Sequence, residues 1–248
     1  MEDFSDIINL DNLYKFSKTF KRNKPFKHTF IEEIFHRDFY EKLYNTYPEI
    51  NEKFTLVNSI SKMQYWRGWD KRKDVENKIS NKISNNKEDP SLSKEWNKFL
   101  RYIMTDEFAS HFREFSGINV TNICDCGFAA YKKGGFQLPH IHNVGPSTLV
   151  MLFYFSKGWQ KGDSGGTYCA YEEDESKIFF EPYNLDNSMI IFHDGPLAAH
   201  GARYITKDVT RQAFAINIEN YSNEKGWSGG IDKQNFISSI KPKNKKIK

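Results

Sequence analysis

The sequence has few cysteines and no long apolar run, and each shortage excludes a class of protein. Its 248 residues include only Cys124, Cys126 and Cys169, and an odd number argues against a secreted disulfide framework. The longest apolar run, 149–155, is far shorter than the roughly 20 residues of a membrane helix. Residues 1–6 are acidic where a secretory signal would be basic and then apolar. We therefore expect a cytoplasmic protein with no membrane partner.

Most of the chain also lacks an excess of positive or negative charge. There are 36 Lys and Arg against 32 Asp and Glu, a net charge of +4, and five of the lysines lie within 241–248. The remainder is therefore close to neutral. A basic tail can contact nucleic acid or an anionic membrane, but a solvated terminus is the simpler interpretation. We expect no nucleic-acid partner, and the composition leaves the oligomeric state open.

Aromatic residues, in contrast, are abundant and indicate a large folded core. The chain has 21 Phe, 13 Tyr and 5 Trp, each of which buries a large area. The length suits one domain, because single β-sandwiches and barrels commonly reach about 200–250 residues. We expect residues 1–120 to form a mostly helical support layer and 121–222 a β core. Residues 223–248 would be a C-terminal extension with the basic tail.

The first half has the spacing of amphipathic helices. Four apolar residues recur at every fourth position and predict a helix that ends near Pro48: Phe35, Phe39, Leu43 and Tyr47. A second helix is expected to begin within 89–91, where Asp-Pro-Ser precedes an apolar pattern, and a short strand within 54–66.

The second half has short apolar or alternating runs separated by turn residues. Eight strands are predicted: 123–132, 137–143, 147–155, 165–171, 177–181, 188–193, 198–204 and 211–219. Short strands at such even spacing are typical of a jelly roll rather than of a parallel α/β sheet. The expected fold class is mainly β with an α-helical layer.

Histidines are few, yet several of the seven gather in the predicted β core. His140 and His142 fall in the second predicted strand, where residues two apart point to the same face. If this face is the interior, His200 from the seventh strand would complete three ligands to a transition metal and leave positions open. A His-x-His pair also arises by chance, and His193, beside a turn, is better explained as structural.

The order of residues around these histidines resembles the 2-oxoglutarate- and Fe(II)-dependent oxygenases of the prolyl-hydroxylase-like kind. In that family a His-x-Asp pair supplies two iron ligands, which His140 and His142 match, with His142 in place of the Asp. The distal histidine of the family matches His200. The resemblance covers most of 24–220, including 25–31, which looks like the family's first strand. It implies that the jelly roll is a double-stranded β-helix, cupin-like core.

The same resemblance implies a cosubstrate site. The basic residue that anchors the far carboxylate of 2-oxoglutarate matches Arg211, whose planar guanidinium suits bidentate pairing. Tyr154 matches a tyrosine that shares this carboxylate, and Tyr131 matches one that lines the pocket. The Gly-Gly pair at 165–166 matches the start of the fourth strand. The implied cofactors are Fe(II) and 2-oxoglutarate, with ascorbate as a candidate addition.

The implied activity is that of a dioxygenase and hydroxylase. O2 and 2-oxoglutarate would be consumed, a C–H bond of a small molecule, sugar or peptide would be hydroxylated, and succinate and CO2 would be released. The departure at His142 bears on this expectation, because a neutral imidazole leaves a ferrous centre more positive than a carboxylate does. It leaves open whether the metal and 2-oxoglutarate turnover are retained.

Two alternatives share the scaffold. Gly134, His140 and His142 match the opening of a cupin metal motif, which would give a 2-oxoglutarate-independent dioxygenase or isomerase. The Glu that this motif expects three or four residues after its second His is absent, since Pro146 and Ser147 stand near that place. A non-catalytic binding module is the other alternative, and only His142 favours it.

A dense cluster of Trp66, Arg67 and Trp69 is a candidate substrate site. Indole rings there could stack on a sugar or peptide, and Arg67 could meet an acid. The alternative is that the two tryptophans pack the helical layer against the barrel.

Overall fold

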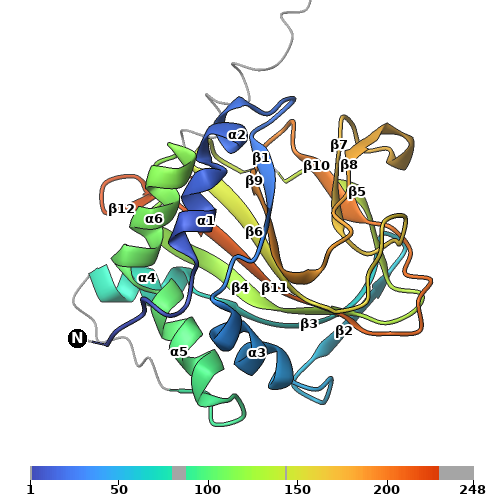
Figure 1. Cartoon of the computed structure of the whole chain (residues 1–248). Coiled ribbons are helices and arrows are strands. Elements are labelled where there is room, and N and C mark those ends of the chain that lie inside the picture. The colour runs from blue at the N-terminus through green and yellow to red at the C-terminus, as the bar shows by residue number, and fades with distance from the viewer. Residues whose placement is uncertain (1, 80–87, 143, 229–248) are drawn as a thin grey trace, which may run out of the picture.

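A computed structural model describes residues 2–79, 88–142 and 144–228. It consists of a long curled sheet with helices against one face (Figure 1). The helices of the described ranges are α1 Leu10–Lys15, α2 Ser17–Arg22, α3 Arg37–Asn45, α4 Arg72–Ile79, α5 Lys94–Ile103 and α6 Asp106–Ser116, with a 3-10 turn at Glu175–Lys177. No helix in these ranges is both long and apolar enough to cross a membrane.

The eight strands predicted from the alternating pattern are confirmed. They are β4 Asn122–Tyr131, β5 Phe136–His140, β6 Thr148–Phe155, β7 Thr167–Ala170, β8 Ile178–Phe180, β9 Asp186–His193, β10 Ala199–Ala202 and β11 Arg211–Glu219. The largest difference is in the second strand, which ends at His140 and leaves His142 in the segment beyond it.

Three further strands come from the first half of the chain. They are β1 His28–Glu32, β2 Thr55–Ser59 and β3 Lys62–Asp70, and the sheet order is β1-β9-β6-β11-β4-β3-β5-β10-β7-β8, with β2 on β3. The sheet is therefore not confined to 121–222, and the single strand expected within 54–66 is a hairpin. The sequence of β3 does not alternate between apolar and polar residues, because large side chains pack on both faces of this strand. Trp66 lies on the cavity side and Trp69 on the side of the helices.

Both predicted helices are present. The first is α3, and the second is α5, which begins after Ser93 rather than within 89–91. The Ser93 side chain accepts a hydrogen bond from the Trp96 backbone nitrogen and so caps the helix. A small hairpin, β12 Tyr221–Ser222 with β13 Gly226–Trp227, follows β11. The basic tail at 241–248 lies outside the described residues.

The aromatic core lies between the helices and the convex face of the sheet. Trp96 of α5 is fully buried, and its ring centroid is 4.6 Å from that of Phe128 on β4. Phe214 of β11 packs against both rings. Because strand residues alternate between faces, this packing assigns every second residue of β4 and β11 to the helical side and the others to the concave side.

The concave residues of β4 and β11 form four rows of directly opposed pairs. From one end to the other they are Tyr131 with Arg211, Ala129 with Ala213, Gly127 with Ala215, and Asp125 with Asn217. The two middle rows are therefore small, and the outer rows are large or polar. Small side chains between large ones leave a cavity of about 320 Å³ on this face, which also reaches residues of β5, β6 and β10.

Candidate metal centre and adjoining pocket

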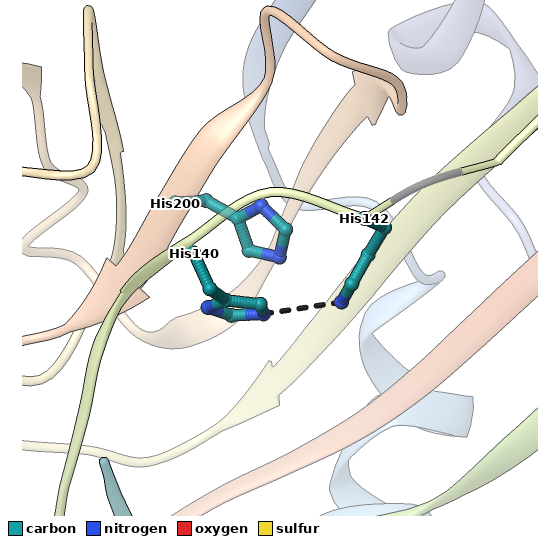
Figure 2. A group of neighbouring side chains, drawn as sticks. All are labelled: His140, His142 and His200. Atoms are coloured by element: carbon teal, nitrogen blue, oxygen red, sulfur yellow. Dashed lines mark hydrogen bonds between the residues drawn. The ribbon is translucent and has the colours of Figure 1, made fainter.

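Three histidines point toward one another (Figure 2), and all three are among the residues that line this cavity. His140 ends β5, His142 follows two residues later, and His200 lies on β10 directly opposite His140 in the antiparallel pair. Their potential ligand atoms all lie within 4.8 Å of one another. The three histidines that the sequence singles out are thus brought together, from two segments that are about 60 residues apart in the chain.

Hydrogen bonds to main-chain carbonyls fix the tautomers of two of these rings. His140 Nδ1 is 3.1 Å from Leu138 O, and His200 Nδ1 is 2.8 Å from Ala198 O. A carbonyl only accepts, so each Nδ1 carries the proton and each Nε2 is left with a lone pair. This is the tautomer in which Nε2 can ligate a metal.

His142 is held in the same tautomer by a buried carboxylate. Its Nδ1 donates to Asp194 Oδ2 at 2.7 Å, and the Asp194 side chain is only 2% exposed. Asp194 Oδ1 accepts a further hydrogen bond from Gly195 N at 2.9 Å, which fixes the carboxylate. Asp194 is a site residue that the sequence did not reveal, because the segment after β9 has only the pattern of a turn.

The geometry of the three rings suits a cation. His140 Nε2 and His142 Nε2 are 3.1 Å apart, so two lone pairs face each other at a distance that a bound divalent ion would make favourable. Burial, together with the neighbouring His140, lowers the pKa of His200 to about 3, and burial also lowers the pKa of His140. Both rings therefore stay unprotonated at neutral pH, as metal ligands must.

Arg211 lies between two tyrosines, directly behind the end of the cavity that Tyr131 and Thr167 line. Its guanidinium carbon is 4.9 Å from the ring centroids of both Tyr131 and Tyr154. Nε donates to Gly165 O at 3.0 Å, and Nη2 donates to Thr167 Oγ1 at 3.1 Å. Nη1 is buried and has no hydrogen-bond partner within the described ranges. A buried N–H of a guanidinium without an acceptor is costly, so this atom suits an anionic ligand.

The two tyrosines are neutral donors beside this guanidinium. Burial raises the pKa of Tyr131 to about 12 and also raises the pKa of Tyr154. The Tyr154 hydroxyl accepts from Thr167 N at 2.9 Å, so its own proton is available to a ligand oxygen. The Tyr131 hydroxyl donates to Gln137 Oε1 at 3.1 Å, and Gln137 Nε2 is 3.0 Å from His140 Nε2. Gln137 therefore links Tyr131 to the histidines, and its amide nitrogen, which can only donate, has to leave the His140 Nε2 lone pair when a metal binds there.

The aromatic cluster on β3 is divided between the two faces of the sheet. Trp66 lines the cavity, whereas Arg67 and Trp69 point to the helical side, because neighbouring strand residues alternate. Arg67 is 6% exposed and pairs with Asp89 at 2.5 Å, and its guanidinium carbon lies 5.6 Å from the Trp69 ring centroid. The hypothesis that all three line a substrate mouth is therefore wrong for Arg67 and Trp69.

Comparisons with known proteins identify the fold. No family model and no curated protein sequence matches the chain. A prolyl-4-hydroxylase from Pseudomonas putida is similar in structure, with a TM-score of 0.57 and 11% identity over 85% of this chain and 100% of that one. The non-haem α-ketoglutarate-dependent carbocyclase SnoK from nogalamycin biosynthesis is also similar in structure. Its TM-score is 0.57, with 11% sequence identity over 94% of this chain and 93% of that one.

A third structure is a prolyl hydroxylase from Trichoplax adhaerens in complex with a fragment of hypoxia-inducible factor. It gives a TM-score of 0.54 and 15% identity over 84% of this chain and 88% of that one. The chain therefore has the fold of the 2-oxoglutarate- and Fe(II)-dependent oxygenases, as the resemblance predicts. The expected mainly β architecture with a double-stranded β-helix core is confirmed.

Proposed function

We propose that the protein is a non-haem Fe(II)- and 2-oxoglutarate-dependent dioxygenase that hydroxylates a C–H bond. The observation that carries the proposal is one cavity with two complementary ends. Three imidazole rings converge on a cation position at one end. Behind the Tyr131 and Thr167 end, the buried guanidinium of Arg211 has its Nη1 without a hydrogen-bond partner among the described residues, so that this nitrogen can donate to an anion. A diacid that chelates a metal through one end and pairs with an arginine through the other fits both features.

The residues of the chain have distinct tasks in this proposal. His140, His142 and His200 would hold one face of the metal ion and leave its remaining positions open. Arg211 would pair with the far carboxylate, and Tyr154 would donate its hydroxyl proton to the same group. When bound, Fe(II) with 2-oxoglutarate and O2 supplies the oxidising chemistry, with succinate and CO2 as co-products.

Burial adds to these tasks. The guanidinium of Arg211 is 1% exposed, so its attraction for a carboxylate is screened less than at the surface. The rings of Tyr131 and Tyr154 on its two sides restrict its orientation, so it needs little rearrangement to accept the ligand.

A cupin-type enzyme that does not use 2-oxoglutarate is the second candidate. The three histidines favour the cupin-type enzyme, because the dioxygenase motif has an Asp as a metal ligand and His142 stands in its place. The free Nη1 of Arg211 favours 2-oxoglutarate instead, since a cupin mechanism gives this buried donor no anion to bind.

Anaerobic calorimetry separates these candidates. Mn(II) is titrated into the protein first, as a redox-stable substitute for Fe(II), and 2-oxoglutarate is then titrated into the metal-loaded protein. The dioxygenase should bind 2-oxoglutarate, and more tightly with metal than without. A cupin-type enzyme should bind metal but no 2-oxoglutarate, and a non-catalytic module need bind neither. Succinate release from the Fe(II) form in air then tests turnover.

A further inference from the structure

The cavity is also lined by polar side chains that have no task in the proposed cosubstrate site. We call four of them, which carry charged or amide groups, the polar lining: Lys62 and Gln64 on β3, beside Gln137 and Tyr131, and Asp125 and Asn217 at the opposite end. Asp125 and Asn217 form the outermost of the four rows on β4 and β11. Asn217 is six residues from Arg211 along β11, which corresponds to about 20 Å in a strand. A five-carbon diacid anchored at Arg211 is much shorter, so the Asp125 and Asn217 end of the cavity is left for the substrate.

Trp66 forms an aromatic platform next to this end of the cavity. Gly68 and Gly127 are opposed on neighbouring strands, and the indole of Trp66 lies over both. A Cβ at Gly68 would overlap the indole, and one at Gly127 would be 2.8 Å from its Cζ2 atom. The paired glycines therefore allow the ring to lie against the sheet with its other side toward the cavity. Asp125 is two residues from Gly127 on the same face, so a carboxylate lies beside the indole.

The polar lining carries one charge of each sign. Lys62 and Asp125 interact electrostatically across the cavity, but they form no ion pair with each other in the described part of the chain. Arg72 also attracts Asp125, although its own ion pairs are with Asp70 and Glu219. Asp125 and Lys62 are both half-buried, which raises the pKa of Asp125 to about 6 and lowers the pKa of Lys62. Partly buried charges without a direct counterion are costly, and a ligand can supply both counterions.

The sign of each charge limits the ligand. A purely cationic ligand would be attracted to Asp125 but repelled by Lys62, and a purely anionic ligand would meet the reverse. A neutral sugar would leave both charges unpaired. Only a molecule with separate positive and negative groups pairs with both residues. An indole beside a carboxylate is also a favourable environment for an alkylammonium group.

We propose that the substrate is a zwitterionic small molecule of the amino-acid type. Its ammonium group binds Asp125 and the face of Trp66, its carboxylate binds Lys62, and Gln64 and Asn217 hydrogen-bond to the remainder. This inference deepens the proposed function, because it names the substrate of the same cavity, but the binding of the zwitterion does not itself require turnover.

The test uses defined probes and the whole chain. The twenty protein amino acids, β-alanine and γ-aminobutyrate are titrated calorimetrically into the protein loaded with Mn(II) and 2-oxoglutarate, and also into the metal-free protein. At least one probe should bind. For the tightest one, Asp125→Asn and Lys62→Met should each weaken binding at least tenfold, the size expected for loss of one partly buried charge pair.

Matched probes and variants assign each group. The N-acetyl form of the tightest probe lacks the ammonium, so its weaker binding should be insensitive to Asp125→Asn. The methyl ester lacks the carboxylate and should be insensitive to Lys62→Met. Asp11→Asn and Lys18→Met, two exposed positions on the helical side, remove the same charges far from the cavity and should leave the affinity of the parent probe unchanged.

The outcomes distinguish this inference from the proposed function. If Mn(II) and 2-oxoglutarate bind but no amino-acid probe does, the zwitterion is wrong and the function stands. The zwitterion is equally excluded if a neutral sugar or a peptide capped at both ends binds and is insensitive to Asp125→Asn and Lys62→Met. If metal and 2-oxoglutarate do not bind, the proposed function fails, and the titrations of the metal-free protein still test the zwitterion.

Discussion

His142 donates a 2.7 Å hydrogen bond from Nδ1 to the buried carboxylate of Asp194. In the resembling oxygenases an Asp is itself the ligand at the position of His142. In this protein the carboxylate of Asp194 does not face the metal position itself. It binds the side of the His142 ring that points away from that position. A carboxylate in this place orients a ligating histidine and raises its basicity. The pair therefore restores part of the negative charge that the substitution of Asp by His removes.

Removal of the Asp194 charge should weaken metal binding. Asp194→Asn keeps the size and a hydrogen-bond acceptor but loses the charge, and we expect Mn(II) affinity to fall about 10- to 100-fold, the usual effect of a lost partner of a ligating histidine. Competition with a coloured chelator measures this affinity. Asp208→Asn, at an exposed carboxylate in a bend, is the matched control. Equal affinities of both variants would contradict the role of Asp194.

An aspartate at position 142, as in the oxygenase family that the chain resembles, should not by itself give a site that binds metal well. His142→Asp would place a second carboxylate near Asp194 and remove the donor that Asp194 now has, so we expect weaker Mn(II) binding and a lower melting temperature. His142→Asp combined with Asp194→Asn removes the repulsion and should bind metal better than His142→Asp alone. Chelator competition and thermal melts compare the three proteins. If His142→Asp has the same Mn(II) affinity and melting temperature as the double variant, the two carboxylates do not interact.

Arg211 should affect 2-oxoglutarate but not the metal. Arg211→Met removes the guanidinium but keeps much of the volume between the two tyrosines. Loss of one partner of a buried charge pair costs about 2 to 5 kcal/mol, so 2-oxoglutarate affinity should fall roughly 30-fold or more. Mn(II) affinity should stay within about twofold, because Arg211 does not contact the histidines. Calorimetry with each ligand measures both effects, and unaltered 2-oxoglutarate affinity would exclude Arg211 as its anchor.

Arg67 should contribute to stability and not to ligand binding. Burial of Asp89 raises the pKa of its carboxyl, but hydrogen bonds from Ser91 and the Arg67 guanidinium outweigh this and hold the pKa at about 2. The folded value lies below the ordinary 3.8, so the stabilisation is complete above pH 3.8 and is lost as the pH falls to about 2. A shift of this size corresponds to about 2 kcal/mol.

Arg67→Met should therefore lower the free energy of unfolding at pH 7, and the difference from the unaltered protein should shrink below pH 3.8. Urea unfolding at several pH values measures this dependence. The affinity for 2-oxoglutarate should not change, since Arg67 faces the helices. A variant with full stability and impaired ligand binding would return Arg67 to the cavity side.

The sequence predicted the β core well because its signal is local. Alternation within runs such as Arg211–Glu219 sets strand and face together, and turn residues mark the ends. The hairpin of β2 and β3 was less visible, because its faces mix polar and aromatic residues such as Gln64 and Trp66. The same mixing explains why Arg67 was placed with Trp66, although the two lie on opposite faces.

The candidate site was predicted only in part, for a physical reason. His140, His142 and His200 carry a recognisable spacing and order, so the sequence could single them out. Asp194 carries no such signal, because its role depends on the 2.7 Å approach of a turn to a distant histidine. The position of Asp125 beside Trp66 likewise depends on strand register and on the absence of a side chain at Gly127.

The size of the side chains in the two small rows on the concave face determines how long a ligand the cavity can hold. Ala129, Ala213, Gly127 and Ala215 make up these rows, and all four lie between the row of Arg211 and the row of Asp125. None of them carries a reactive group, so single enlargements such as Ala215→Val would shorten the space for a ligand without altering its terminal anchors. Selection or engineering could in this way change which chain length of substrate is accepted while the chemistry stays the same.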